Sequence, residues 1–299
     1  MPVQVKQLHA HFVAEISGVD LAKPVDAAAF VQLQAAIDQH GVLVFHGQPL
    51  SEEVLLAFSG LFGKLESVIS AIRKDAKLRL HSQLADISNL DEDNQVLGQN
   101  DRRRMFALGN QLWHTDSSFK RIPAKYSLLH AHSVTPAGGE TQFVDMRAAY
   151  ETLPAVMKTR IDGMVAEHSI FNSRATLGFS DFSEDERREL PPVHRPVVRE
   201  HPGSGRKSLY LASHASHIVG LPVPDGRMLI RDLIEHATQP HLVHTHTWQV
   251  GDLVIWDNRC TMHRGRPYDE AKHRRDLRRA TIQDDGPMSA PVAARAQVA

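Results

Sequence analysis

The spacing of apolar residues predicts that the chain begins with two helices around one short strand. Apolar residues recur at helical spacing through 26–40 and again through 49–63, and the apolar run 42–45 between them is typical of a buried strand. Both helices have the polar side chain and the glycine that often mark helix ends. We expect them to begin at the caps Asp26 and Ser51 and to end at Gly41 and Gly63.

Further along the chain the pattern predicts mainly strands. They are expected over 125–134 and 138–146, in a hairpin within 194–213, and on both sides of Gly251-Asp252 within 242–258. Helical spacing returns over 145–163 and 225–238. Because the strands are not separated by regular helices, a doubly wound parallel sheet is disfavoured. The pattern favours a mainly β fold, a sandwich or jelly roll with helical insertions.

We expect one domain over 1–288, since no internal repeat and no long linker divides the chain. Residues 64–108 are polar and poorly periodic, and a long irregular segment in a compact domain is often a functional lid. A lid-like insertion is therefore predicted near 64–108. The tail 289–299 has no core pattern and is predicted to be disordered.

The composition narrows the function classes. Of 299 residues, 42% are hydrophobic, which allows a sizeable core. The net charge of −1 disfavours nucleic-acid and membrane-surface partners, so the run 102–104 of three arginines is expected to be an exposed loop. No apolar run approaches the roughly 20 residues of a membrane helix. A single cysteine, Cys260, excludes an intramolecular disulfide, and no signal-peptide pattern is present, so we expect a cytoplasmic protein.

The stretch GNQLWHTDSSF, 109–119, holds a candidate metal site. His114 and Asp116 are two residues apart, so on a strand both side chains would point to the same face. A candidate third ligand is His263, which follows the apolar run LVIW and a polar turn in WDNRCTMHRG. Two histidines and one carboxylate on one face of a metal are typical of non-haem Fe(II) oxygenases.

Other interpretations of these residues stay open. The chain has 19 histidines, and the pairs His130/His132, His244/His246 and His214/His217 could compete as ligands. We favour structural or surface roles for these pairs, because no carboxylate partner accompanies them. The His/Asp/His set could also serve a zinc hydrolase, or belong to a barrel that binds a small acid without catalysis.

Arginines are dense after His263, in RGRPYDEAKHRRDLRRATIQDD. Arg275 and Arg279 are four residues apart, as are Arg274 and Arg278. They could form a solvated basic face. Alternatively, two of them could enter a pocket and each bind a carboxylate through its planar guanidinium.

These motifs together resemble a known family. WHTD, GGET, WDNRCTMH and RRxLRR occur in the same order in the taurine dioxygenase/TfdA family of Fe(II)- and 2-oxoglutarate-dependent dioxygenases. The resemblance extends from AEISGVDL to LRRATIQDD, nearly the whole chain. Stretches such as NQLWHTDSSF, HPGSGRK and GDLVIWDNRC make it most similar to the 2,4-dichlorophenoxyacetate dioxygenases. The resemblance implies a double-stranded β-helix (jelly roll) core, Fe(II) as cofactor, and 2-oxoglutarate and O2 as co-substrates.

The resemblance also implies roles for individual residues. The iron ligands would be His114, Asp116 and His263, and the distal carboxylate of 2-oxoglutarate would be bound by Thr141 and Arg275. The anionic head of the substrate would be bound by Arg279, with Asn110 as a polar residue near the substrate. The segment before RRxLRR is one residue longer than is usual in the family. Counting from His263 would select Arg274 and Arg278 instead, whereas the motif itself selects Arg275 and Arg279, which we follow.

The implied reaction is hydroxylation of the carbon next to the carboxylate of an aryloxyacetate such as 2,4-dichlorophenoxyacetate. Its products would be a phenol, glyoxylate, succinate and CO2. The alternative is the same chemistry on taurine, another sulfonate or an alkyl sulfate. Residues 64–108 and the stretch 171–182 are candidates for the wall of an aryl pocket. The resemblance further implies that the protein binds a small anionic organic substrate. It also implies that the protein forms a homo-oligomer.

Overall fold

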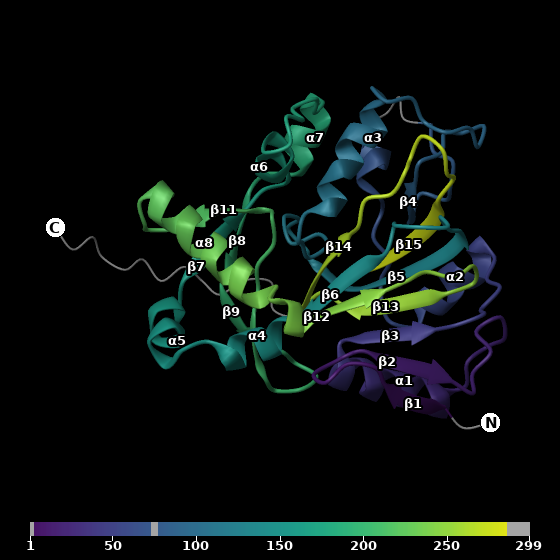
Figure 1. The fold of residues 1–299 in the computed structure, drawn as a ribbon, viewed down its shortest axis with the longest axis horizontal. Helices are drawn as coiled ribbons and strands as arrows, with labels where there is room; N and C mark the ends of the chain where they lie inside the picture. Colours follow the sequence, from purple (N-terminus) through teal and green to yellow (C-terminus); the bar gives the residue numbers. More distant parts are fainter. Residues whose placement is uncertain (1–2, 73–76, 286–299) are drawn as a thin grey trace.

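The computed structural model describes residues 3–72 and 77–285, and one large sheet supports this part of the chain (Figure 1). Its strands are β1 (Gln4–Gln7), β2 (Ala14–Ser17), β3 (Val42–Phe45), β4 (Leu84–Ser88), β5 (Ala124–Ser133), β13 (Leu253–Asp257) and β15 (Asp276–Gln283). Within the described residues, the order across the sheet is β1-β2-β3-β13-β5-β15-β4. The predicted tail, 289–299, lies outside the described residues.

The central strand β13 is buried on both faces. Leu253 and Ile255 contribute to one hydrophobic cluster, while Val254 and Trp256 contribute to another. Successive side chains of a strand point to opposite faces, so an unbroken apolar run marks a strand that is covered on both sides. The predicted strands 42–45 and 125–134 are confirmed as β3 and β5.

One face of the large sheet is covered by α1 (Ala27–His40) and α2 (Glu52–Gly60). The caps are confirmed: Asp26 and Ser51 accept hydrogen bonds from the first turns, and Gly41 ends α1 with a positive φ of 70°. The expected end of α2 at Gly63 is wrong. After Gly60 the backbone N–H groups donate to carbonyls three residues earlier, so the chain forms turns in place of a further α-helical turn. In this conformation Phe62 packs on Phe58 and Tyr126 in the core.

The opposite face of the large sheet packs on a smaller sheet. It contains β12 (Val243–His246), β6 (Thr141–Asp145) and β14 (Thr261–Gly265), in that order. Phe143 of β6 and Trp256 of β13 meet between the sheets, with ring centroids 5.6 Å apart. The strands predicted within 138–146 and 242–258 are thereby confirmed. β12 and β13, on either side of Gly251, lie in different sheets, so this glycine turn crosses from one layer to the other.

Helices and short strands form the side of the molecule drawn on the left in Figure 1. They are α4 (Met146–Thr152), α5 (Ala155–Ile161), α6 (Ile170–Ala175), α7 (Glu184–Glu189), α8 (Val223–Ala237), β7 (Val165–His168), β8 (Val193–Pro196), β9 (Val198–Glu200), β10 (Lys207–Leu209), β11 (Ala215–Ile218) and the 3-10 turn η3 (Pro240–Leu242). The predicted hairpin is confirmed as β9 and β10, and the helix over 225–238 as α8. The single helix expected over 145–163 is wrong, because Pro154 interrupts it and separates α4 from α5.

The polar segment 64–108 is less irregular than the sequence predicts. It contains the 3-10 turn η1 (Ile69–Ile72), strand β4 and helix α3 (Arg102–Ala107), which continues into η2 (Leu108–Gln111). β4 pairs with β15 at the edge of the large sheet, where a strand needs little apolar sequence. The exposed loop expected at 102–104 is wrong. These arginines begin α3, where Arg102 pairs with Glu186 and Arg104 with Glu270.

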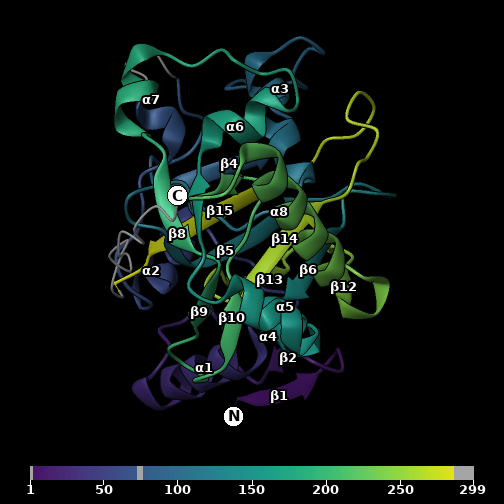
Figure 2. The same cartoon turned by 90° about the vertical axis from the view of Figure 1, so that its left-hand side faces the viewer.

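Helices α3, α6 and α7 gather at one end of the two sheets (Figure 2). An aromatic cluster holds them together, in which Phe106 contacts Phe179 and Phe182 edge to face. Among the described residues, no helix is long and apolar enough to cross a membrane. The fold is thus mainly β with helices at its periphery, and the helical end covers the site described below.

Because His168, at the end of β7, is buried, we expect the folded protein to lose stability in acid. His168 is fully buried, and burial together with the Arg195 guanidinium lowers its pKa to about 3. In the unfolded chain its pKa returns to the ordinary value near 6.5. Below that value the unfolded state binds the extra proton, so this group's contribution to stability is lost as the pH falls. Between about pH 7.5 and pH 5.5 the loss from this one group should be about 1 kcal/mol.

Urea unfolding at both pH values measures this effect. The variant His168→Asn can keep the hydrogen bond to Ser118 (3.0 Å) but cannot titrate. Its free energy of unfolding should therefore depend less on pH than that of the wild type, by about 1 kcal/mol over this range. An unchanged pH dependence in the variant would contradict the assignment to His168.

Candidate metal centre and its two cavities

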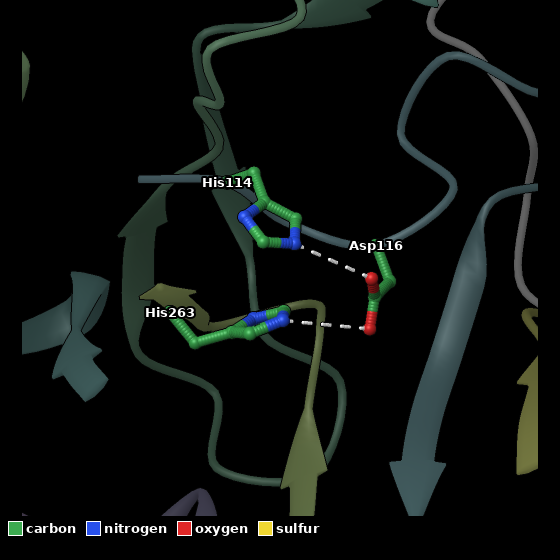
Figure 3. A group of neighbouring side chains, drawn as sticks. All are labelled: His114, Asp116 and His263. Atoms are coloured by element: carbon green, nitrogen blue, oxygen red, sulfur yellow. Dashed lines mark ion pairs between the residues drawn. The ribbon is translucent and has the colours of Figure 1, made fainter. Parts of the chain in front are cut away.

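His114, Asp116 and His263 meet in one buried cluster (Figure 3). One ligand atom from each lies within 4.8 Å of the other two. The Nε2 atoms of His114 and His263 are each 3.7 Å from a different oxygen of the Asp116 carboxylate. The structure therefore brings the three predicted ligands together across 149 residues of sequence (263 minus 114).

The local reason for this arrangement differs from the expected one. His114 and Asp116 do not share a strand: His114 forms an isolated bridge with His263, and Asp116 lies in the turn that follows. The backbone of His114 donates to the carbonyl of His263 (3.0 Å) and accepts in return (2.9 Å). Thr115 anchors the turn, since its hydroxyl contacts the carbonyls of Leu211 and Thr261. The turn directs the Asp116 carboxylate back toward both imidazoles.

Several donors hold the Asp116 carboxylate. Arg279 donates to one oxygen (2.6 Å) and the Ser127 hydroxyl to the other (2.8 Å), and Asn258 accepts from the backbone N–H of Asp116 (3.1 Å). Burial alone would raise the pKa of Asp116, but the Arg279 guanidinium, together with the hydrogen bond from Ser127, holds it well below its usual value. The carboxylate is therefore ionised and fixed in orientation.

Both histidines have the protonation state that metal binding requires. Burial lowers the pKa of His114 and of His263, so the rings are neutral at ordinary pH. Nδ1 of His114 lies 2.7 Å from the carbonyl oxygen of Leu112 and can donate to it, which leaves the Nε2 lone pair directed at the cluster. Two neutral imidazoles and one ionised carboxylate fit a divalent transition metal such as Fe(II).

A smaller cavity, of about 100 Å³, opens on one side of the cluster. Its wall includes His114, His263, Thr141, Arg275 and Asn110. The hydroxyl of Thr141 accepts a hydrogen bond from the Trp248 indole (3.0 Å), so its own hydrogen can be donated to a ligand. Arg275 is buried and donates to the backbone carbonyl of Gly139 (3.0 Å). A hydroxyl and a guanidinium in one pocket suit a carboxylate.

The structure distinguishes the two possible arginine pairs. Arg275 and Arg279 both line the smaller cavity. Arg274 is exposed to solvent, and Arg278 points elsewhere, to Glu52 (2.8 Å) and Asp276 (3.3 Å). Neighbouring residues of an extended chain point to opposite faces, so only one of the two pairs can face the cavity. The motif, and not the count from His263, selects that pair.

A larger cavity, of about 240 Å³, adjoins the smaller one at the cluster. Asp116 and Arg279 line it, and so do the aromatic side chains Phe106 and Phe119. Asn110 and His114 line both cavities. From 64–108, residues such as Leu97 and Phe106 contribute to the wall as expected. The expectation for 171–182 is mostly wrong: of that stretch only Arg174 lines this cavity, while Phe171, Phe179 and Phe182 pack in the aromatic cluster.

Other candidate histidines lie outside the cluster. His130 and His132 contact each other (3.1 Å), and His246 lies beside Asp252 (3.2 Å). Of the three histidine pairs considered as competing ligands, only His214 lines the larger cavity, and its ring is in edge contact with the His114 ring. Among the described residues a second group, His201, Asp257 and Cys260, could in principle bind a metal. Arg259 already pairs with Asp257 (2.6 Å), and burial raises the pKa of the Cys260 thiol, so this group is better suited to a structural role.

Sequence reasoning missed three polar residues of the site. Ser127 lies inside the predicted strand 125–134, where nothing in the pattern sets it apart. Its hydroxyl donates directly to Asp116, which is 11 residues earlier in the chain. Asn258 belongs to the quoted WDNRC motif, and its amide donates to Ser127 (3.0 Å). Arg174 follows no recognisable pattern, although an arginine between two apolar stretches is a weak signal of a buried charge.

Comparison with known proteins identifies the family. A family model described as taurine catabolism dioxygenase TauD, TfdA family matches residues 4–281. The chain belongs to the TauD/TfdA family. The resemblance that the motifs indicate is thereby confirmed.

Individual members of the TauD/TfdA family match most of the chain. The alpha-ketoglutarate-dependent 2,4-dichlorophenoxyacetate dioxygenase of Cupriavidus pinatubonensis is 47% identical over 285 residues, which are 95% of this chain and 99% of that relative. An alkylsulfatase of Acinetobacter baylyi is 32% identical over 274 residues, 87% of this chain and 79% of the relative. The solved structure of AAD-2 in complex with Mn(II) and N-oxalylglycine matches with a TM-score of 0.92 at 47% identity, and covers 96% of this chain and 100% of that one.

Proposed function

We propose that this protein is a dioxygenase that uses Fe(II), 2-oxoglutarate and O2 to hydroxylate an aryloxyacetate such as 2,4-dichlorophenoxyacetate. The observation that carries the proposal is the position of the His114/Asp116/His263 cluster in the walls of two adjoining cavities. One is lined by Thr141 and Arg275, and the other by Phe106 and Phe119. The similarity to the Cupriavidus enzyme and to AAD-2 supports it. We also propose that the two facing sheets form the double-stranded β-helix, or jelly roll, that the resemblance implies.

In this proposal His114, Asp116 and His263 hold iron(II). When bound, the iron lets O2 oxidise 2-oxoglutarate to succinate and CO2 while one oxygen atom passes to the substrate. The smaller cavity would bind 2-oxoglutarate, with its distal carboxylate between the Arg275 guanidinium and the Thr141 hydroxyl. Because both groups are buried, little water competes for that carboxylate.

The larger cavity would bind the substrate. Arg279 would attract its carboxylate, and Asn110 would lie near the same end. The remaining wall includes Phe106, Phe119 and Ile170, which suits an aromatic ring. Held this way, the methylene between the ether oxygen and the carboxylate faces the cluster, and position decides which carbon reacts.

Hydroxylation of that methylene gives a hemiacetal. The bond from the hydroxylated carbon to the ether oxygen then breaks, the hydroxyl hydrogen passes to the departing oxygen, and the products are a phenol and glyoxylate. This collapse needs no dedicated acid–base pair. Taurine fits the cavity less well, because it has no aromatic ring to pack against Phe106, Phe119 and Ile170.

Succinate formation tests the proposal. The protein, loaded anaerobically with Fe(II), receives 2-oxoglutarate and O2, with 2,4-dichlorophenoxyacetate in one sample and taurine in another. We expect succinate and an equal amount of phenol in the first sample alone. Succinate in the taurine sample alone would keep the reaction class and overturn the substrate. No succinate above the substrate-free background in either sample would contradict the proposed substrate.

Four further sequence-based expectations remain predictions. They are a single domain over 1–288, a lid role for 64–108, a cytoplasmic location and a homo-oligomeric assembly.

A further inference from the structure

Arg174 is a buried cation in the wall of the larger cavity. It lies near the end of α6 and is 4% exposed. Its guanidinium carbon lies 4.5 Å from the centroid of the Phe106 ring. Gly109 leaves the space for this head group, because a side chain at that position would overlap it. The arginine is thus held against the cavity by an aromatic face on one side and bare backbone on the other.

Few of the hydrogen-bond donors of Arg174 are used. Its Nη1 has one long contact, 3.5 Å to the Ser173 hydroxyl, and its buried Nε has no partner. An arginine has five N–H donors in a rigid planar fork, and such a group usually binds carboxylates with two parallel hydrogen bonds. Most of this capacity remains available to a ligand in the cavity.

The neighbouring cations differ from Arg174. The other arginines of this cavity and Lys120 have carboxylate partners: Arg79 with Asp86, Arg102 with Glu186, Arg103 with Asp101, Lys120 with Glu66 and Arg279 with Asp116. Lys77 is exposed to solvent. Within residues 3–72 and 77–285, no carboxylate lies within ion-pairing distance of Arg174.

A buried charge without a counter-ion is costly, and proteins rarely keep one without a use. Burial, with a smaller effect from Arg279, lowers the pKa of Arg174 to about 10. The side chain nevertheless stays protonated at neutral pH. An anion that enters the larger cavity would therefore be attracted by two cations. One of them, Arg279, is already neutralised in part by Asp116.

We propose that Arg174 is a binding residue for the substrate's carboxylate, which it shares with Arg279. This inference rests on the proposed function, since it assumes that the larger cavity holds an aryloxyacetate. Arg174 lines only the larger cavity, whereas Arg275 and Thr141 line the smaller one, so each carboxylate has its own arginine. The substrate anion thereby supplies the counter-ion that Arg174 lacks.

Binding to a catalytically inert complex tests this proposal. The protein is loaded with Mn(II) and N-oxalylglycine, and the dissociation constants of 2,4-dichlorophenoxyacetate and of its neutral amide are measured by calorimetry. In Arg174→Gln the acid should bind at least about 30-fold more weakly, as expected when one partner of a buried charged pair is lost. The amide should change by less than about 3-fold.

Two further variants complete the test. Arg174→Lys keeps the charge without the planar fork and should recover part of the affinity for the acid. Arg187→Gln is the matched control: this exposed arginine also lies over a phenylalanine ring, that of Phe171, but does not line the cavity. It should bind the acid as the wild type does.

The possible results separate the alternatives. Unchanged affinity of Arg174→Gln for the acid would overturn the role of Arg174 and leave the proposed function intact. Equal losses for acid and amide would indicate a structural role and also overturn it, as would a loss confined to N-oxalylglycine. If the wild type binds no aryloxyacetate at all, the proposed substrate class fails, and this inference fails with it.

Discussion

Replacing Asp116 by alanine should abolish both metal binding and 2-oxoglutarate turnover. The carboxylate is buried and faces the Nε2 atoms of His114 and His263 at 3.7 Å. Its removal leaves the Arg279 cation without its partner beside the two imidazoles, where it would repel a metal ion. Mutation even of an outer partner of a metal ligand typically weakens metal affinity by about 10- to 100-fold, so loss of a ligand should weaken it by more than about 100-fold. Dialysis against Mn(II) and an assay for succinate measure the two effects.

Two comparisons make this result interpretable. Asp116→Asn keeps the shape of the side chain and should also lose metal, which separates the loss of charge from the loss of folding. His244→Ala removes a histidine of the pair His244/His246, which lies on β12 and outside the cluster. This variant should bind Mn(II) as the wild type does. A folded Asp116→Ala protein that still forms succinate would refute the assignment of the metal centre.

Replacing Arg275 by glutamine should raise the KM for 2-oxoglutarate by about 100-fold, with a smaller effect on kcat. The guanidinium is buried in the smaller cavity and shares it with the Thr141 hydroxyl. No water can replace it at low cost in a buried site, so the distal carboxylate would lose its counter-ion. Steady-state kinetics with varied 2-oxoglutarate, and the dissociation constant of N-oxalylglycine, report the change.

The chain offers matched controls for Arg275. Arg274 is its neighbour in sequence but is exposed, and Arg278, in the strand β15 that follows Arg275, pairs with Glu52. Arg274→Gln should leave the KM for 2-oxoglutarate within about 2-fold of the wild-type value. If Arg274→Gln instead weakened 2-oxoglutarate binding and Arg275→Gln did not, the strand would be shifted by one residue relative to the structure described above.

The sequence predicts those parts of the fold that depend on neighbouring residues. The Asp26 cap and the Gly41 stop of α1 are local signals, and both are confirmed. β4 could not be predicted, because the short edge strand 84–88, LADIS, has no regular alternation and is specified by its pairing with β15. The interruption at Pro154 was open to prediction from proline chemistry alone, but helical spacing on both sides concealed it.

In the candidate site, too, the sequence identifies the residues that a motif marks but not the contacts that depend on the fold. The spacing of His114 and Asp116 suggested a shared face, yet a turn anchored by Thr115 brings their side chains together. The choice of Arg275 and Arg279 over Arg274 and Arg278 came from a motif, and strand alternation explains it physically. Arg174 could not be found in the sequence. What distinguishes it is the lack of a carboxylate partner in three dimensions.

The hydrogen bonds between the backbones of His114 and His263 also constrain the order of events during synthesis. The chain leaves the ribosome at about 5–20 residues per second, so His114 and Asp116 exist for on the order of ten seconds before His263 follows. Joining the ends of so long a loop costs entropy, which only the assembled sheets repay. The three proposed ligands therefore come together only when the sheets have assembled, and a chain that ends before residue 263 lacks one of them.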